Sequence, residues 1–212
     1  MNDYLCGAIS GFSQTIVGHP FDTLKILKQT NKPININIKS LFAGIKYPLF
    51  SSSLICSFQF GIYEYYLKKD NNSFYSGFLS GLIISPLCFL WDIGKIKNQT
   101  NQTFFIKNIL QEKGLFMTSA RDSIALSIYF GTFEKVKENN ISSFTGGAIA
   151  GVTNWTITYP LDVIRSRQIA NKIDIIDAIK IKNYWRGYTS CMIRAMLVNS
   201  VGLSIYDYVK YL

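Results

Sequence analysis

The chain alternates between long stretches without charged residues and short stretches rich in Lys, Arg, Asp and Glu. Charged residues are absent from residues 4–21, 47–63, 73–91 and 141–161. Two further stretches, 115–133 and 189–206, contain only the pair Arg121 and Asp122, and Arg194, respectively. A helix needs about 17–25 mainly apolar residues to cross a bilayer. The pattern therefore predicts six membrane-spanning helices, over residues 4–21, 47–67, 74–97, 118–136, 143–167 and 190–211.

A short motif closes three of these stretches and recurs at a constant interval along the chain. The copies begin Pro20-Phe21-Asp22, Leu90-Trp91-Asp92 and Pro160-Leu161-Asp162, and a cation follows each Asp by three positions, at Lys25, Lys95 and Arg165. Positions three apart share one face of a helix. A fixed period of this kind marks an internal repeat. We predict one domain of three tandem repeats, residues 1–70, 71–140 and 141–212, each with two helices.

Composition narrows the class of protein. The mean hydropathy of +0.15 is low for helices that face lipid on all sides, and it favours helices with one polar face around a watery cavity. The net charge of +9 suits anionic membranes, anionic substrates or nucleic acid. We expect no nucleic-acid partner, because no nucleic-acid motif accompanies the charge. The four cysteines lie in separate spans without a Cys-x-x-Cys pair, which favours free thiols over a disulfide or metal site.

The three motif copies resemble the signature Pro-x-Asp/Glu-x-x-Lys/Arg-x-Lys/Arg of the mitochondrial carrier family (solute carrier 25), over essentially the whole chain. Leu90 stands where the family has proline, and Leu27 where it usually has a cation. The resemblance implies an all-α membrane protein, in which three helical hairpins with pseudo-threefold symmetry surround a central cavity. It also implies a monomeric, multi-pass transporter of the mitochondrial inner membrane without a cofactor, which exchanges solutes by alternating access.

The resemblance further implies two gates of ion pairs, each joining neighbouring repeats. The matrix gate comprises Asp22, Lys25, Gln29, Asp92, Lys95, Gln99, Asp162 and Arg165. The cytoplasmic gate comprises Glu64, Lys68, Glu134, Lys137, Asp207 and Lys210. In the first repeat Leu67 occupies the position of the family's cation, and Lys68 follows it. We expect each gate to be closed in one state of the transporter and broken in the other.

Between the gates, charged residues inside the spans are candidates for substrate binding. Arg121 follows Ser51 by the same interval that separates successive copies of the motif. Arg194 in turn follows Arg121 by the interval that separates Gly114 from Gly187, so the three positions are equivalent in the repeats. They coincide with the substrate contact points of the family.

Asp122 lies beside Arg121 in a span that is otherwise free of charge. Adjacent helix positions point about 100° apart, so we expect Asp122 and Arg121 not to form a good salt bridge. A cation of the substrate is then the expected partner of Asp122.

Local sequence around these positions indicates a substrate class. Asn154-Trp155 and Arg121-Asp122 resemble the carnitine/acylcarnitine and basic amino acid carriers of the family. In this interpretation Arg121 and Arg194 bind a carboxylate, Asp122 binds an ammonium group, and Trp155 adds a cation–π contact. The alternatives are a nucleotide or deoxynucleotide carrier and a membrane scaffold without transport. An enzyme is not expected, since the sequence contains no nucleophile–base pair, metal cluster or phosphate-binding loop.

Glycines at equivalent positions of the repeats suggest lipid sites. Gly44, Gly114 and Gly187 precede the second helix of each repeat. Backbone N–H groups at a helix N-terminus favour phosphate. The resemblance implies that the lipid is cardiolipin.

Overall fold

The computed structural model describes residues 3–29, 41–42, 45–99, 114–185 and 188–211. Within this part the regular elements are all helices, with no strand. The helices are α1 (Asp3–Gln29), α3 (Lys46–Asp70), α4 (Ser73–Gln99), α5 (Leu115–Glu138), α6 (Ser143–Asn171), α7 (Ile175–Lys180) and α8 (Tyr188–Lys210). Each of the six long helices covers one predicted span, and the short α7 was not predicted.

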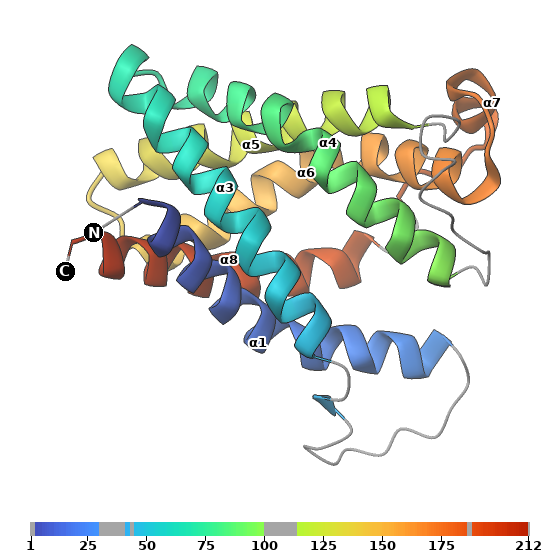
Figure 1. Cartoon of the computed structure of the whole chain (residues 1–212), viewed down its shortest axis with the longest axis horizontal. Helices are drawn as coiled ribbons and strands as arrows, with labels where there is room; N and C mark the ends of the chain where they lie inside the picture. Colours follow the sequence, from blue (N-terminus) through green and yellow to red (C-terminus); the bar gives the residue numbers. More distant parts are fainter. Residues whose placement is uncertain (1–2, 30–40, 43–44, 100–113, 186–187, 212) are drawn as a thin grey trace.

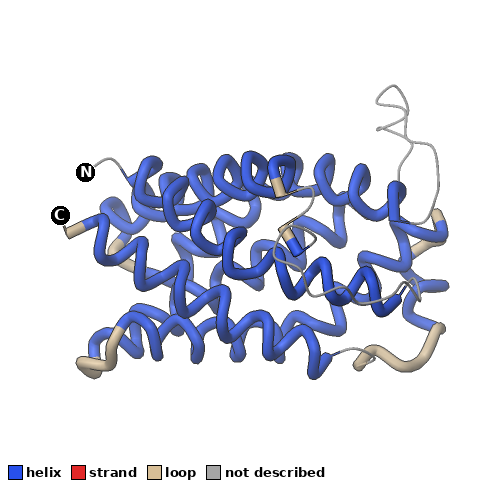
Figure 2. Tube along the Cα trace, turned by 90° about the horizontal axis from the view of Figure 1, so that it is seen from below, coloured by secondary structure: helices blue, strands red, loops and turns tan. Residues whose placement is uncertain are grey.

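The six long helices form a closed ring (Figure 1). α1 packs against α3, α4 against α5, and α6 against α8, so successive long helices form helical hairpins. Contacts between α3 and α4, α5 and α6, and α8 and α1 join the hairpins. Both chain termini lie at one end of the ring, called here the terminal end, and α7 lies at the opposite, distal end (Figures 1 and 2).

Tight turns connect successive hairpins at the terminal end. After α3, Asn71 adopts a left-handed conformation with φ 50°, and its N–H donates to Leu67 O. The side chain of Asn72 then accepts hydrogen bonds from the N–H groups of Phe74 and Tyr75, each 3.1 Å long. Such caps satisfy backbone groups that a helix end leaves without partners. Asparagine tolerates the left-handed region, which explains the sharp reversal between α3 and α4.

Small residues let the helices of each hairpin approach closely. A Cβ atom on Gly81 would lie 2.4 Å from Asp122 O on α5, and one on Gly11 would lie 2.7 Å from Ser52 O on α3. Neither backbone oxygen can move aside without displacing its helix. These glycines therefore allow the two helices of a hairpin to pack with their backbones in close contact.

Prolines lie inside three of the helices without ending them. Pro20 lies in α1, Pro160 in α6, and Pro86 in α4. Helices surrounded by other helices tolerate proline because neighbouring groups satisfy the freed carbonyl. Pro86 lies one turn before Leu90, the position at which the motif lacks proline.

The largest hydrophobic cluster lies toward the terminal end. It draws on α1, α3, α5, α6 and α8, and its centre is aromatic. The rings of Tyr63 and Phe130 stack with centroids 3.8 Å apart, and those of Phe60 and Tyr206 with centroids 3.9 Å apart. Aromatic pairs contribute about 0.5–1.5 kcal/mol each beyond the area they bury. This cluster closes the centre of the ring on the side of the termini.

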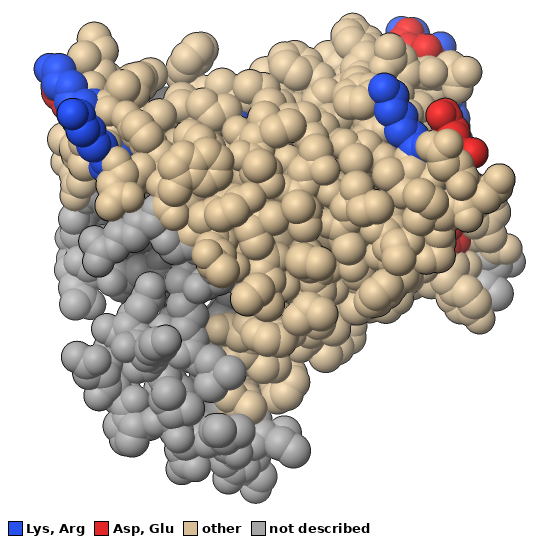
Figure 3. All heavy atoms as spheres, turned by 180° about the vertical axis from the view of Figure 1, so that it is seen from behind, with Lys and Arg blue, Asp and Glu red and all other residues tan. Residues whose placement is uncertain are grey.

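The outer surface is largely apolar. In Figure 3 charged side chains gather near the two ends, and a broad uncharged band separates them. Exposed Phe58, Leu82 and Ile157 contribute to the apolar surface. By length and composition alone, one helix of the described part, over Ser73–Ile93, is apolar enough to cross a membrane, with a mean hydropathy of 1.6.

Candidate functional site

A network of five charged side chains lies inside the ring, toward the distal end. Arg165 Nη1 lies 2.7 Å from Asp92 Oδ2 on α4, and Arg165 Nη2 lies 3.0 Å from Asp162 Oδ1 on its own helix. Arg121 Nη1 lies 2.7 Å from Asp122 Oδ1, and its Nε lies 3.5 Å from Asp162 Oδ1. Arg165 also lies 4.0 Å from Asp122. Predicted gate residues and predicted substrate residues therefore form one charge network.

The expectation that Arg121 and Asp122 would not pair is wrong. Their side chains form a salt bridge, although they are adjacent on α5. The arginine side chain is long enough to reach the carboxylate of Asp122, although the two residues point in different directions from the helix. Both residues also meet α6, where Asp162 and Arg165 lie close to them. The additional charges around Asp122 thus come from the protein itself.

Asp122 keeps one unused oxygen in this network. Asp122 is 5% exposed, and its Oδ2 is buried without a hydrogen-bond partner among the described residues. A buried carboxylate oxygen without a donor is costly in free energy. The side chain can therefore accept a further hydrogen bond from a cationic or polar group.

Trp155 contacts the same network. Arg121 Cζ lies 5.1 Å from the centroid of the Trp155 ring, a distance suited to a cation–π contact. The ring therefore meets a cation of the protein, whereas the sequence suggested a cation of the substrate.

The remaining predicted substrate residues lie around the interior of the ring. Ser51 is buried and donates its hydroxyl to Pro48 O at 3.1 Å, within α3. Asn154 is buried on α6, and its Oδ1 accepts a hydrogen bond from Thr158 at 3.2 Å. Arg194 on α8 packs against α1 at Gly18, where a Cβ atom would lie 3.4 Å from the guanidinium Nη2.

Some predicted gate and lipid residues lie outside what the structure describes. Gly44 and Gly187 fall outside the described residues. The same holds for the side chains of Asp22, Lys25, Gln29, Lys95 and Gln99. Gly114 is described, and its φ of +116° at the start of α5 suits glycine.

The terminal end carries ion pairs between different hairpins. Lys210 on α8 pairs with Glu64 on α3, and Lys137 on α5 pairs with Asp207 on α8. Glu64 is 3% exposed and also accepts a hydrogen bond from the Tyr206 hydroxyl at 2.9 Å. These contacts cover the aromatic cluster on the side of the termini.

The third position of this terminal set differs. Lys68 Nζ lies 2.7 Å from Asp3 Oδ2, and both residues belong to the first hairpin, so this ion pair does not join two hairpins. The hydrogen bond and charge of Asp3 raise the pKa of Lys68. Glu134 makes no ion pair with another described residue, because Leu67 packs against the hydrophobic cluster at the position of the expected cation.

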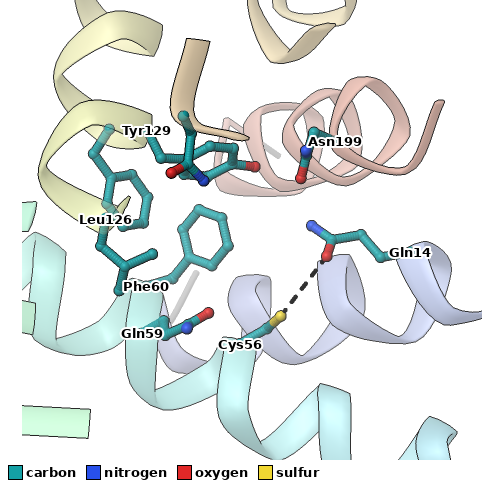
Figure 4. Close-up of a pocket in the computed structure, with 9 residues that line it drawn as sticks. Gln14, Cys56, Gln59, Phe60, Leu126, Tyr129 and Asn199 are labelled. Atoms are coloured by element: carbon teal, nitrogen blue, oxygen red, sulfur yellow. Dashed lines mark hydrogen bonds between the residues drawn. The ribbon is translucent and has the colours of Figure 1, made fainter. Parts of the chain in front are cut away.

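A cavity of about 100 Å³ lies inside the ring, next to the aromatic cluster. Four amide side chains line it, from Gln14, Gln59, Asn154 and Asn199. Figure 4 shows the amides of Gln14 on α1 and Asn199 on α8 pointing toward each other across the site. Sequence analysis identified Asn154 and missed the other three. Their signal was weak, because uncharged amides occur throughout the spans and no motif singles them out.

Aromatic rings form the rest of the cavity wall, together with Cys56 and Leu126. The rings are those of Phe60, Tyr129 and Phe130, which also belong to the hydrophobic cluster. Within the described residues, no group of His, Cys, Asp and Glu side chains is arranged to bind a metal ion. The interior thus combines a charged network with an uncharged polar cavity, an arrangement suited to binding a small polar solute.

Comparison with known proteins shows similarity to mitochondrial carriers. Residues 137–212 match the family model described as "Mitochondrial carrier protein". "Mitochondrial substrate carrier family protein S" of Dictyostelium discoideum is 25% identical over 99% of this chain and 96% of its own length. The "Mitochondrial arginine transporter BAC2" of Arabidopsis thaliana is 26% identical, over 97% of this chain and 89% of its own length. The "Mitochondrial basic amino acids transporter" of Rattus norvegicus is 25% identical, over 93% and 85%.

The chain is therefore similar, over nearly its whole length, to proteins of the mitochondrial carrier family, as its repeated motif indicated. These relatives are named as mitochondrial carriers and transporters.

Proposed function

We propose that this carrier exchanges a small zwitterionic solute of the amino acid or carnitine type across the mitochondrial inner membrane, by alternating access. In this proposal the six long helices span the membrane as three tandem repeats, residues 1–70, 71–140 and 141–212, around the central site. The uncharged band of Figure 3 supports this orientation, because it separates charged groups at the two ends of the ring. The low hydropathy of most spans then reflects their polar inner faces.

The observation that carries the substrate class is the buried Oδ2 atom of Asp122, which has no hydrogen-bond partner among the described residues. The described side chains around it are those of Arg121, Arg165 and Asp162, with Asp92 on the far side of Arg165. An ammonium group of the solute would donate to Asp122 Oδ2, and the solute's carboxylate would meet Arg121 or Arg194.

Ion pairs at both ends of the ring support alternating access. In the proposed mechanism the ion pairs of the terminal end stay formed while the distal network binds the solute. The solute then competes for the charges that hold the distal end together. A ligand shifts such an equilibrium only by its different affinity for the two states. Because the contact between Arg165 and Asp92 joins α6 to α4, its displacement weakens the distal closure directly.

Two relatives named for arginine and basic amino acids support an amino acid substrate. The alternative, a nucleotide carrier, is supported by the net charge of +9, because nucleotides are anions. The Oδ2 atom of Asp122, unpaired within the described part of the chain, favours the amino acid type instead, because a nucleotide triphosphate has no ammonium group to donate to it. We also propose the cardiolipin sites at Gly44, Gly114 and Gly187, and a monomeric state, from the family resemblance alone.

The experiment is uptake into proteoliposomes loaded with a mixed pool of amino acids, carnitine and nucleotides. We expect uptake of labelled zwitterions, and we expect Asp122→Asn to reduce it by at least about 100-fold, because a desolvated charge contact is lost. Asp177→Asn, on the exposed face of α7, is the matched control and keeps full uptake. Uptake of nucleotides alone would establish the alternative, and folded protein without any uptake would indicate a scaffold.

A further inference from the structure

The uncharged cavity lies between the hydrophobic cluster and the distal charge network. Toward the terminal end, its aromatic residues merge with the hydrophobic cluster. Toward the distal end, Leu126 follows Arg121 by five residues on α5, and Asn199 follows Arg194 by five residues on α8. Five helical residues span about 7.5 Å. A solute bound to the charged residues by its amino acid head can therefore reach the cavity with a short side chain.

The amides that line the cavity have hydrogen-bonding capacity to spare. The thiol of Cys56 donates to Gln14 Oε1 at 3.9 Å, and Gln14 Nε2 donates to Ser10 Oγ at 3.4 Å, which are both long contacts. Gln59 and Asn199 make no side-chain hydrogen bond to another described residue. Each amide offers two donors and an oxygen acceptor. A ligand in the cavity can therefore be bound from several sides.

Glycines on the neighbouring helices make room for two of these amides. A Cβ atom on Gly202 would lie 2.0 Å from Gln14 Nε2, and one on Gly151 would lie 2.3 Å from Asn199 Nδ2. Any side chain at these positions would push the amides away from where they now lie. The position of Gln14 and Asn199 thus depends on glycines of other helices.

The chemistry of the lining selects among side-chain types. The residues that line the cavity carry no formal charge, so a cationic or anionic group there would lose its hydration without gaining a counter-ion. An apolar group would leave the amides without partners, which is also costly. An uncharged planar group with donors and acceptors satisfies the amides, and the faces of Phe60, Tyr129 and Phe130 can pack against it.

We infer that the amide-lined cavity of Gln14, Gln59, Asn154 and Asn199 is a specificity subsite, which binds an uncharged planar group of the substrate, such as a carboxamide or a ureido group. The inference rests on the proposed function, because the charged head of the same solute occupies the distal network. It distinguishes this chain from relatives named for basic amino acids, whose substrates end in a charged group.

The test compares glutamine with methionine, which share the zwitterionic head and have side chains of similar length. Uptake into proteoliposomes is measured for wild type, Gln59→Met and Asn199→Leu. We expect wild type to prefer glutamine by at least about tenfold in kcat/KM, since an apolar side chain leaves the amides unpaired. Both variants lower glutamine uptake and bring the ratio close to one, while methionine uptake is retained. Phe58→Leu, on the outer face of α3, is the control and leaves the ratio unchanged.

A third variant, Gly202→Ala, displaces the Gln14 amide and lowers the same ratio without removing any polar group. Thermal melting of each purified variant shows that it is folded. If the ratio of kcat/KM for glutamine to that for methionine is unchanged in all three folded variants, the subsite proposal is wrong. The proposed function still stands in that case, provided that both amino acids are taken up. If wild type takes up neither amino acid nor carnitine, the proposed function is wrong and the subsite is rejected with it.

Discussion

The two ends of the helical ring are held together in different ways. At the terminal end, one hydrophobic cluster joins five helices, and ion pairs such as Glu64 with Lys210 cover it. At the distal end, two small hydrophobic clusters lie apart, around Ile93 and around Ile164. The charges between them form a mixed network centred on Arg165. Apolar packing therefore closes one end, whereas charge pairing joins the other.

This difference indicates which end a solute can open. Packed aromatic rings resist gradual opening, because separating them loses many contacts together. A charge network can exchange one partner for another, and a charged solute supplies such a partner. Under the proposed function we therefore expect the distal end to be the one that responds to the solute, while the terminal end stays closed.

The largest expected effect is at Arg165, which joins three carboxylates. Arg165→Gln leaves Asp92, Asp122 and Asp162 with Arg121 as their described cation, and breaking a buried pair costs about 3–5 kcal/mol. We expect loss of transport and a melting temperature lower by ~10 °C, which fluorescence-monitored unfolding measures. Arg165→Lys, which keeps the positive charge, retains part of the transport activity and part of the thermal stability. If Arg165→Gln transports normally, the distal end does not depend on this network.

A smaller effect is expected at Glu64, where apolar packing remains after the charge is removed. Glu64→Gln loses the pair with Lys210 but keeps an acceptor for Tyr206, at a cost of about 1–3 kcal/mol. We expect a melting temperature lower by ~2–8 °C, together with measurable transport. Lys180→Met, which removes the exposed pair with Asp177 on α7, is the control and changes neither the melting temperature nor transport. A loss as large as that of Arg165→Gln would contradict the difference between the ends.

The smallest effect is expected at Leu67, where the terminal end lacks a third pair between hairpins. Leu67→Lys keeps an aliphatic stem against the hydrophobic cluster and places a cation where Glu134 can bind it. A partly exposed pair adds about 0.2–1 kcal/mol. We expect a rise in melting temperature of ~1–3 °C and slower exchange, because the closed terminal end becomes more stable. The double variant Leu67→Lys with Glu134→Gln should lose this gain. Equal stability of the single and double variants would show that no pair forms.

Local patterns in the sequence determined the helices and their order. Charge-free stretches anticipated all six long helices, because burial and backbone hydrogen bonding depend on residues close together in the chain. The family resemblance also implied that Asp92 pairs with a cation of a neighbouring repeat, and Arg165 Nη1 lies 2.7 Å from Asp92 Oδ2. By contrast, nothing in the pattern indicated the short helix α7.

Only the tertiary structure determined which side chains share a space. Arg121 and Asp122 pair next to Asp162 and Arg165, which belong to α6. The angle between adjacent positions on α5 says nothing about these neighbours from another helix. Likewise, Gln14, Gln59 and Asn199 meet in one cavity because of how α1, α3 and α8 rotate and approach, and glycines such as Gly202 make room for them. Helical periodicity specifies a face within one helix, whereas the meeting of faces depends on packing among all of them.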